Sequence, residues 1–218
     1  MRKVTCAFLA VLVFASCMFT GCKGKVSDEP FNRDDVTLFI SLYGGIQKID
    51  DKSDPNDIAY FFTRLNVPSA YYVSKNKEEA QTVYYSYMNR NNFYPMANLN
   101  EMILAVTKET VGDAVYEGEC CYFVLDSKDD ARLFYESYVD NYMSSKGTTK
   151  TGKKDGYAYA IAYSQSANRA GNCDFVKGVY WKGNSILIMS GSTPTGGQET
   201  FMDYIFLRLS VLDPITLK

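Results

Sequence analysis

Two stretches of the chain, 51 positions apart, share one pattern of a strand, a helix cap and an amphipathic helix. They are Tyr71–Met88 and Tyr122–Val139, and seven of their eighteen aligned residues are identical. In the second stretch, aromatic and β-branched residues favour a strand over Tyr122–Val124. Ser127 with Asp130 then forms the carboxylate variant of a capping box, and apolar residues follow at helical spacing. The chain is therefore predicted to be built around two strand–helix units.

The earlier unit has Asn76 and Glu79 in the same two capping positions. A duplication explains why caps, apolar stripe and charges agree together. The alternative is that any two aromatic-rich strand–helix units look alike in a chain with 18 tyrosines. Two copies are too few for a solenoid, so we expect either two halves of one sheet or two small subdomains.

Each unit is preceded by a segment with apolar residues at helical spacing. These segments are Asp57–Leu65 and Asn98–Val106, and both are predicted to be helices. The repeat is then better described as helix–strand–helix, around residues 57–92 and 98–142.

The rest of the chain alternates between short apolar segments and turn residues. Asp34–Tyr43 predicts a helix, with a strand as the alternative, because its residues also favour β-structure. The other expectations, in chain order, are a short strand at Ile46–Ile49, a linker at Gly112–Glu119, a basic loop at Met143–Asp155, a strand at Gly156–Ser164, a polar loop at Gln165–Asn172, a hairpin of Phe175–Trp181 and Ser185–Ser190 joined by Lys182–Asn184, and a helix at Gln198–Leu212 with Thr195 and Gln198 as its capping box.

The strand Gly156–Ser164 has two very different faces. Tyr157, Tyr159 and Ile161 point one way, and alanines alternate with them on the other side. Small residues permit a close-lying helix, whereas the aromatic face needs cover or a ligand. Strands beside helices in this order predict an α+β fold, an antiparallel sheet covered by helices mainly on one face. We expect one such domain over residues 31–218.

The first residues are typical of a targeting signal rather than of a fold. A positive start is followed by an apolar run that is short for a membrane span, and then by Phe19-Thr20-Gly21-Cys22. This resembles the lipobox of bacterial lipoprotein precursors, although the family usually has an aliphatic residue where Phe19 stands. Phe14–Cys17 is an alternative site, and a plain secretory signal is an alternative reading.

The lipobox resemblance implies that residues 1–21 are a signal peptide and that Cys22 becomes the lipidated N-terminus, modified with diacylglyceryl and palmitate groups. Several acyl chains on one cysteine anchor a protein stably. The resemblance thus implies an extracytoplasmic protein attached to the cell membrane. Residues 22–30 are polar without periodicity, and we expect them to form a flexible tether.

The composition removes several classes of function. The chain has no histidine, which excludes Ser-His-Asp and Cys-His catalysis and most catalytic zinc sites. It has no P-loop or dinucleotide-binding motif, so we expect no cofactor and no metal. A net charge of −2 gives no reason to expect nucleic acid as a partner.

The candidate binding residues lie near the closing hairpin. Tyr180 and Trp181, beside the hairpin turn, are the best candidates for an exposed aromatic recognition pair, with core packing or edge cover as the alternative. Arg169 and Asn172, in the preceding polar loop, are the second choice.

Three cysteines follow Cys22. Cys120 and Cys121 are neighbours, and neighbours on a strand point to opposite faces. One of them, Cys121, could form a disulfide with Cys173 outside the cell. The alternative is buried free thiols.

The folded part resembles the small α+β lipoproteins of low-GC Gram-positive bacteria that have no assigned activity. The likeness lies in the strand–acidic cap–Ala–aromatic helix, the tyrosine strand, the Arg/Asn loop, and the closing hairpin and helix. We expect a non-enzymatic domain that binds a protein or an envelope component. The alternatives are a small-ligand carrier associated with a transporter, with a pocket lined by the Tyr157 face, and an enzyme that works without histidine.

Overall fold

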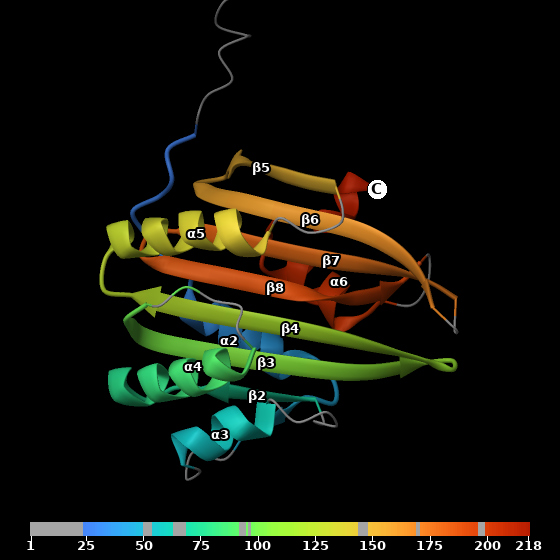
Figure 1. Cartoon of the computed structure of the whole chain (residues 1–218), viewed down its shortest axis with the longest axis horizontal. Helices are drawn as coiled ribbons and strands as arrows, with labels where there is room; N and C mark the ends of the chain where they lie inside the picture. Colours follow the sequence, from blue (N-terminus) through green and yellow to red (C-terminus); the bar gives the residue numbers. More distant parts are fainter. Residues whose placement is uncertain are drawn as a thin grey trace, which may run out of the picture.

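The computed structural model describes residues 24–49, 54–62, 69–91, 95, 97–143, 148–168, 171–195 and 199–218. Its centre is one eight-stranded sheet in the order β1-β2-β3-β4-β8-β7-β6-β5 (Figure 1). The first pair, β1 and β2, is parallel, and all other neighbours are antiparallel. The strands are β1 (Gln47–Lys48), β2 (Ala70–Val73), β3 (Leu99–Val111), β4 (Ala114–Leu125), β5 (Thr148–Lys154), β6 (Tyr157–Asn168), β7 (Gly171–Lys182) and β8 (Ser185–Pro194).

Helices cover both faces of this sheet, and each face has its own hydrophobic core. The front face in Figure 1 is covered by α3 (Pro55–Phe62), α4 (Lys77–Asn91) and α5 (Lys128–Tyr142). The back face is covered by α2 (Arg33–Leu42), α6 (Phe201–Arg208) and the 3-10 helix η1 (Pro214–Leu217). The predicted α+β class is confirmed. The expectation that helices cover mainly one face is wrong, because α2, α6 and η1 bury the second face as well.

The two strand–helix units form as predicted, β2 with α4 and β4 with α5. The side-chain oxygen of Asn76 accepts a hydrogen bond from the Glu79 N–H at 2.9 Å, and Ser127 Oγ accepts one from the Asp130 N–H at 3.1 Å. Both strands pair antiparallel with β3, so the units run parallel and place their helices side by side on the front face (Figure 1). A common origin by duplication stays a prediction.

The helix predicted at Asn98–Val106 is wrong, because this segment is the start of β3. Met102, Ile103, Leu104 and Ala105 are all fully buried, alternating between the front and back cores. The sequence of a strand that is covered on both faces is a continuous run of apolar residues. Such a run also has apolar residues at helical spacing, so it can be mistaken for an amphipathic helix. The second unit is therefore preceded by a strand, and the helix–strand–helix repeat does not hold.

Two segments expected to lack regular structure are strands. Most of the expected linker Gly112–Glu119 belongs to β4, and only a tight turn at Gly112 and Asp113 separates it from β3. Within the expected loop Met143–Asp155, β5 pairs with β6 along the edge of the sheet. Its lysines and threonines suit an exposed edge strand, where charge discourages pairing with another chain.

Several boundaries also differ. The expected loop Gln165–Asn172 is shorter, because β6 runs to Asn168 and β7 begins at Gly171. Lys182 pairs with Ser185, so the β7–β8 turn has two residues instead of three. The last helix is the shorter α6, capped by Thr200 and Asp203. The predicted cap residue Gln198 lies outside the described residues.

The two faces of β6 are covered as its sequence predicts. Its alanines belong to the front core together with residues of α5. Tyr157 and Tyr159 are buried in the back core. The C-terminal segment covers them: Tyr157 Oη accepts a hydrogen bond from the Leu212 N–H at 3.0 Å, and Tyr180 donates one to the Leu212 carbonyl at 2.5 Å. The aromatic face is thus covered by the chain itself.

Candidate functional site

The N-terminal segment Val26–Phe31, here called the strap, crosses one end of the sheet (Figure 1, blue). Val26 is only 4% exposed and belongs to the front core, whereas Phe31 packs against the back core. Between them, the Ser27 N–H donates to the Gly156 carbonyl at 2.7 Å, and the Ser27 carbonyl accepts from the Gly183 N–H at 3.1 Å. These bonds join the strap to the β5–β6 and β7–β8 turns. The tether predicted over 22–30 is therefore wrong from Val26 onward.

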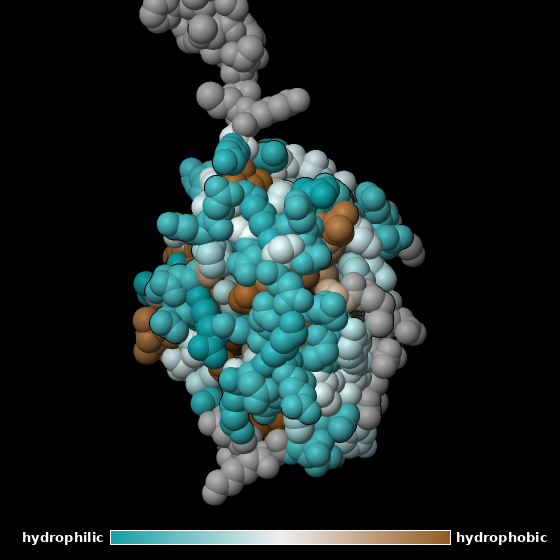
Figure 2. Space-filling model, turned by 90° about the vertical axis from the view of Figure 1, so that its left-hand side faces the viewer, coloured by the Kyte–Doolittle hydropathy of each residue, from teal (hydrophilic) through white to brown (hydrophobic). Residues whose placement is uncertain are grey.

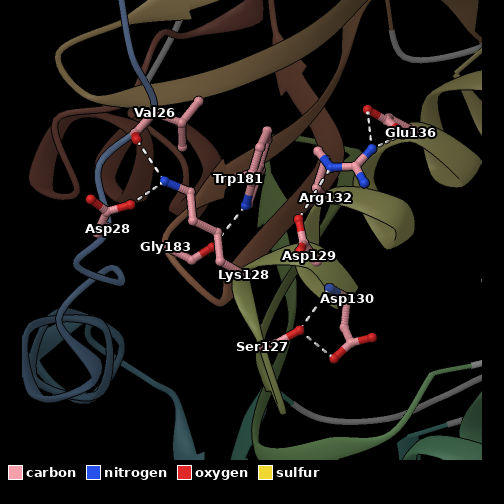
Figure 3. Close-up of polar contacts among 10 residues, drawn as sticks. All are labelled: Val26, Asp28, Ser127, Lys128, Asp129, Asp130, Arg132, Glu136, Trp181 and Gly183. Carbon is pink, nitrogen blue, oxygen red and sulfur yellow. Dashed lines mark hydrogen bonds and ion pairs between the residues drawn. The ribbon is translucent and has the colours of Figure 1, made fainter.

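Lys128, the first residue of α5, fastens the strap from the front (Figure 3). Its ammonium group donates to the Val26 carbonyl at 2.9 Å and to the Asp28 carboxylate at 2.5 Å. The hydrogen bond from Lys128 and its charge lower the pKa of Asp28, with a smaller contribution from the charge of Lys25. Asp28 is exposed, so this ion pair adds little stability. Its effect is to fix where the strap lies.

The turn beneath the strap requires glycine at position 183. Gly183 has a φ of +56°, and a Cβ there would lie 2.6 Å from the Glu29 carbonyl carbon. Trp181 holds this turn by donating its indole N–H to the Gly183 carbonyl at 2.8 Å (Figure 3). Further along, the Phe31 N–H donates to Ser185 Oγ at 2.9 Å. The strap backbone thus packs directly on the β7–β8 turn.

The structure buries the aromatic pair that the sequence suggested for recognition. Tyr180 is 0% exposed in the back core, and Trp181 is 9% exposed in the front core, with its ring centroid 6.0 Å from that of Tyr135. The expectation of an exposed pair is wrong. Because the sheet is covered on both faces, both neighbours on β7 point into a core, and Trp181 supports the strap turn instead.

The other sequence candidates are not brought together with this pair. Asn172 lies in β7 opposite Ala167, at the end of the sheet away from the strap. Its side chain, Arg169 and the lipidation candidate Cys22 lie outside the described residues.

The possible disulfide between Cys121 and Cys173 does not form, and the alternative of buried free thiols is confirmed for Cys120, Cys121 and Cys173. Cys121 is opposite Ile188, which is opposite Val179 on β7. Cys173 lies six residues further along that strand, about 20 Å away at ~3.3 Å per residue. That separation is far too large for a disulfide. Burial also raises the pKa of the Cys120 thiol, which makes it unreactive.

Among the described residues, no helix covers the half of the front face that is farther from the strap. Both α4 and α5 lie over the half nearer the strap, and β3, β4, β6 and β7 continue past them (Figure 1). There the front-facing side chains line up in rows across paired strands. We call this surface the open half-face, and its members are Lys108, Val115, Glu117, Ser164 and Phe175.

The open half-face contains two exposed apolar side chains and an ion pair. Phe175 is 45% exposed and Val115 is 48% exposed, although both lie on central strands of the sheet. Lys108 and Glu117 form an ion pair across β3 and β4, with Nζ and Oε1 3.4 Å apart. An aromatic side chain surrounded by polar groups is typical of the centre of a protein–protein contact.

A row of more buried side chains forms the border of the open half-face on the side where the helices end. Glu119 and Lys177 both lie opposite Ser190, on β4 and β7 respectively. Glu119 accepts a hydrogen bond from Cys121 at 3.1 Å, and Lys177 donates to the Tyr142 carbonyl at 3.0 Å. Burial lowers the pKa of Lys177. This row ties the sheet to the C-terminal end of α5.

The described residues contain no group of three or more His, Cys, Asp or Glu side chains that could hold a metal ion. Among their helices, none is both long and apolar enough to cross a membrane.

Comparison with known proteins gives little. No family model and no curated protein sequence matches the chain. Among solved structures, it is similar to the extracellular domain of PknH from Mycobacterium tuberculosis, with 10% identity over 84% of this chain and 96% of that chain and a TM-score of 0.37. A likeness this weak carries no argument about fold or function.

Substitution of Gly183 tests the packing of the strap on the β7–β8 turn. We expect Gly183→Ala to destabilise more than Gly112→Ala, because both positions have positive φ but a Cβ at Gly112 meets nothing within 4 Å. The left-handed backbone conformation alone should lower the free energy of unfolding by about 1–2 kcal/mol when alanine replaces glycine at either site. The clash with the strap should add roughly 1–3 kcal/mol at Gly183. Urea unfolding of the two variants measures the difference, and equal losses would contradict the described packing.

Proposed function

We propose that this protein is a non-enzymatic recognition domain, anchored by lipid at Cys22 on the outer face of the cell membrane, which binds a protein partner through the open half-face. The observation that carries the proposal is the exposed Phe175 on the interior strand β7, on the same face as the exposed Val115 of β4. A large apolar side chain at such a place is stabilised best when a partner covers it. The lipobox-like Phe19–Cys22 supports the anchor.

The alternatives from the sequence have less support. The small-ligand carrier was expected to use the Tyr157 face, and that face is covered by Leu212 and its neighbours. The open half-face offers Lys108 and Glu117, which already pair with each other. A histidine-free enzyme would need an acid and a base poised for separate roles, and among the open half-face residues this pair is the only set of ionised groups.

The lipid anchor is tested by two cysteine substitutions in the full-length precursor. Cys22→Ser should move most of the protein from the membrane fraction to the soluble extracytoplasmic fraction, and it should abolish incorporation of labelled palmitate. Cys17→Ser removes the alternative site and should leave both unchanged. Fractionation of cells that express each variant gives the answer. Membrane partition that survives Cys22→Ser, or that is lost with Cys17→Ser, would contradict the assignment.

Recognition through the open half-face is tested by photocrosslinking in cells. A photoreactive amino acid at Val115 should give a discrete crosslinked product with a protein partner. Phe175→Ser should reduce its yield about tenfold or more, as expected for loss of an aromatic anchor worth about 2 kcal/mol. Leu133→Ser, on the exposed face of α5, is the matched control and should have no effect. An unchanged yield with Phe175→Ser would refute the surface.

A further inference from the structure

We infer that the strap holds the domain end-on to the membrane, so that the strands run away from the bilayer and the open half-face lies at the far end. This inference rests on the proposed lipid anchor at Cys22. The inference adds the orientation of the domain relative to the membrane, which follows from where the strap packs on the sheet.

The distance between anchor and domain is short. Four peptide steps separate Cys22 from Val26, which is at most about 14 Å of extended chain. Val26 is fixed in the front core, and its carbonyl accepts from Lys128. The strap end of the sheet must therefore stay within this distance of the anchored cysteine.

The contacts of the strap fix the point at which the chain leaves the domain. A chain held at one point would act as a hinge, but this one is held on three sides of the sheet end. Val26 is in the front core, Ser27 is bonded to the two turns, and Phe31 is against the back core. Tyr122 adds a hydrogen bond of 3.0 Å to the Phe31 carbonyl from the middle of the sheet. These contacts fix the direction in which the chain leaves the fold.

The surface at the strap end of the domain is mostly hydrophilic, as expected for a domain that lies next to a membrane without inserting into it. Figure 2 views this end, and hydrophilic residues dominate it, with hydrophobic ones scattered singly. Exposed carboxylates lie there beside basic side chains, among them Asp126, Asp129 and Asp155. Burying such groups in the apolar part of a bilayer is costly. The lipid is thus the part that enters the membrane.

The far end is well removed from the anchor. Leu99, the first residue of β3, pairs with Leu125, which is bonded to Asn184 in the turn beneath the strap. From there β3 runs 13 residues to Val111, about 40 Å at ~3.3 Å per residue. The open half-face lies along the outer part of this strand. Its partner is therefore a protein that stands above the membrane surface, and not lipid.

Energy transfer to the bilayer surface tests this orientation. Lipidated full-length protein carries a donor dye at Asp113→Cys, in the far turn, or at Lys154→Cys, beside the β5–β6 turn. It is bound to phosphatidylcholine–phosphatidylglycerol vesicles that contain a rhodamine-labelled lipid. The transfer efficiency should be several times higher from position 154 than from position 113. A flexible twelve-residue Gly/Ser insertion between Lys25 and Val26 should bring the two efficiencies together.

Flotation of the vesicles separates the two possible failures. If the labelled protein does not float with the vesicles, the anchor is wrong and the orientation falls with it. If the protein floats but both positions transfer equally, the anchor stands and the end-on orientation is overturned. If the insertion leaves the ratio of the two transfer efficiencies unchanged, the role of the strap in setting the orientation is overturned as well.

Discussion

Burial of the central sheet on both faces is the constraint on which the rest of this structure depends. Cys120 and Cys121 are neighbours on β4, and both are fully buried, one in each core. The same is true of Tyr180 and Trp181 on β7. Little sheet surface is then left to contact another molecule. The exception is the half of the front face that α4 and α5 do not reach, where Phe175 and Val115 are exposed.

The strap connects the two cores that the sheet separates. It contributes Val26 to one and Phe31 to the other, and its backbone bonds the two turns between them. Between these two residues its place is set by backbone hydrogen bonds and by the room that Gly183 leaves. The segment nearest the proposed lipid anchor is therefore part of the folded domain, and it can transmit the direction of the anchor to the sheet.

Local patterns predicted the parts of the fold that are determined locally. The caps at Asn76 and Ser127, the two faces of β6 and the β7–β8 hairpin all follow from spacing within one segment. The apolar run of β3 fits both a helix and a doubly covered strand, and only its pairing with β2 and β4 decides between them. The edge strand β5 has too few apolar residues to show a period, because its backbone pairing with β6 is what orders it.

The candidate surfaces were beyond the reach of local patterns for a related reason. The strap has a single buried apolar residue, Val26, and its contacts with the rest of the fold come from residues 91 or more positions away. The open half-face exists because α4 and α5 span only part of the length of the strands on which they pack. The sequence of one element does not show how far a helix extends along the sheet. Phe175, Val176 and Lys177 do not alternate between apolar and polar residues, so the sequence gives no sign that Phe175 is exposed while Val176 is buried.

The integration of the strap into the domain is tested most directly by native-state hydrogen exchange. The Ser27 amide donates to Gly156, and the Gly183 amide donates to Ser27, so both bonds break only if the strap leaves the sheet. We predict that both amides are protected at least about a thousandfold, which is an opening free energy of ~4 kcal/mol. If the Ser27 amide exchanged at the rate of an unfolded chain while the Cys120 and Ile188 amides stayed protected, the strap would be a free tether and the account would be contradicted.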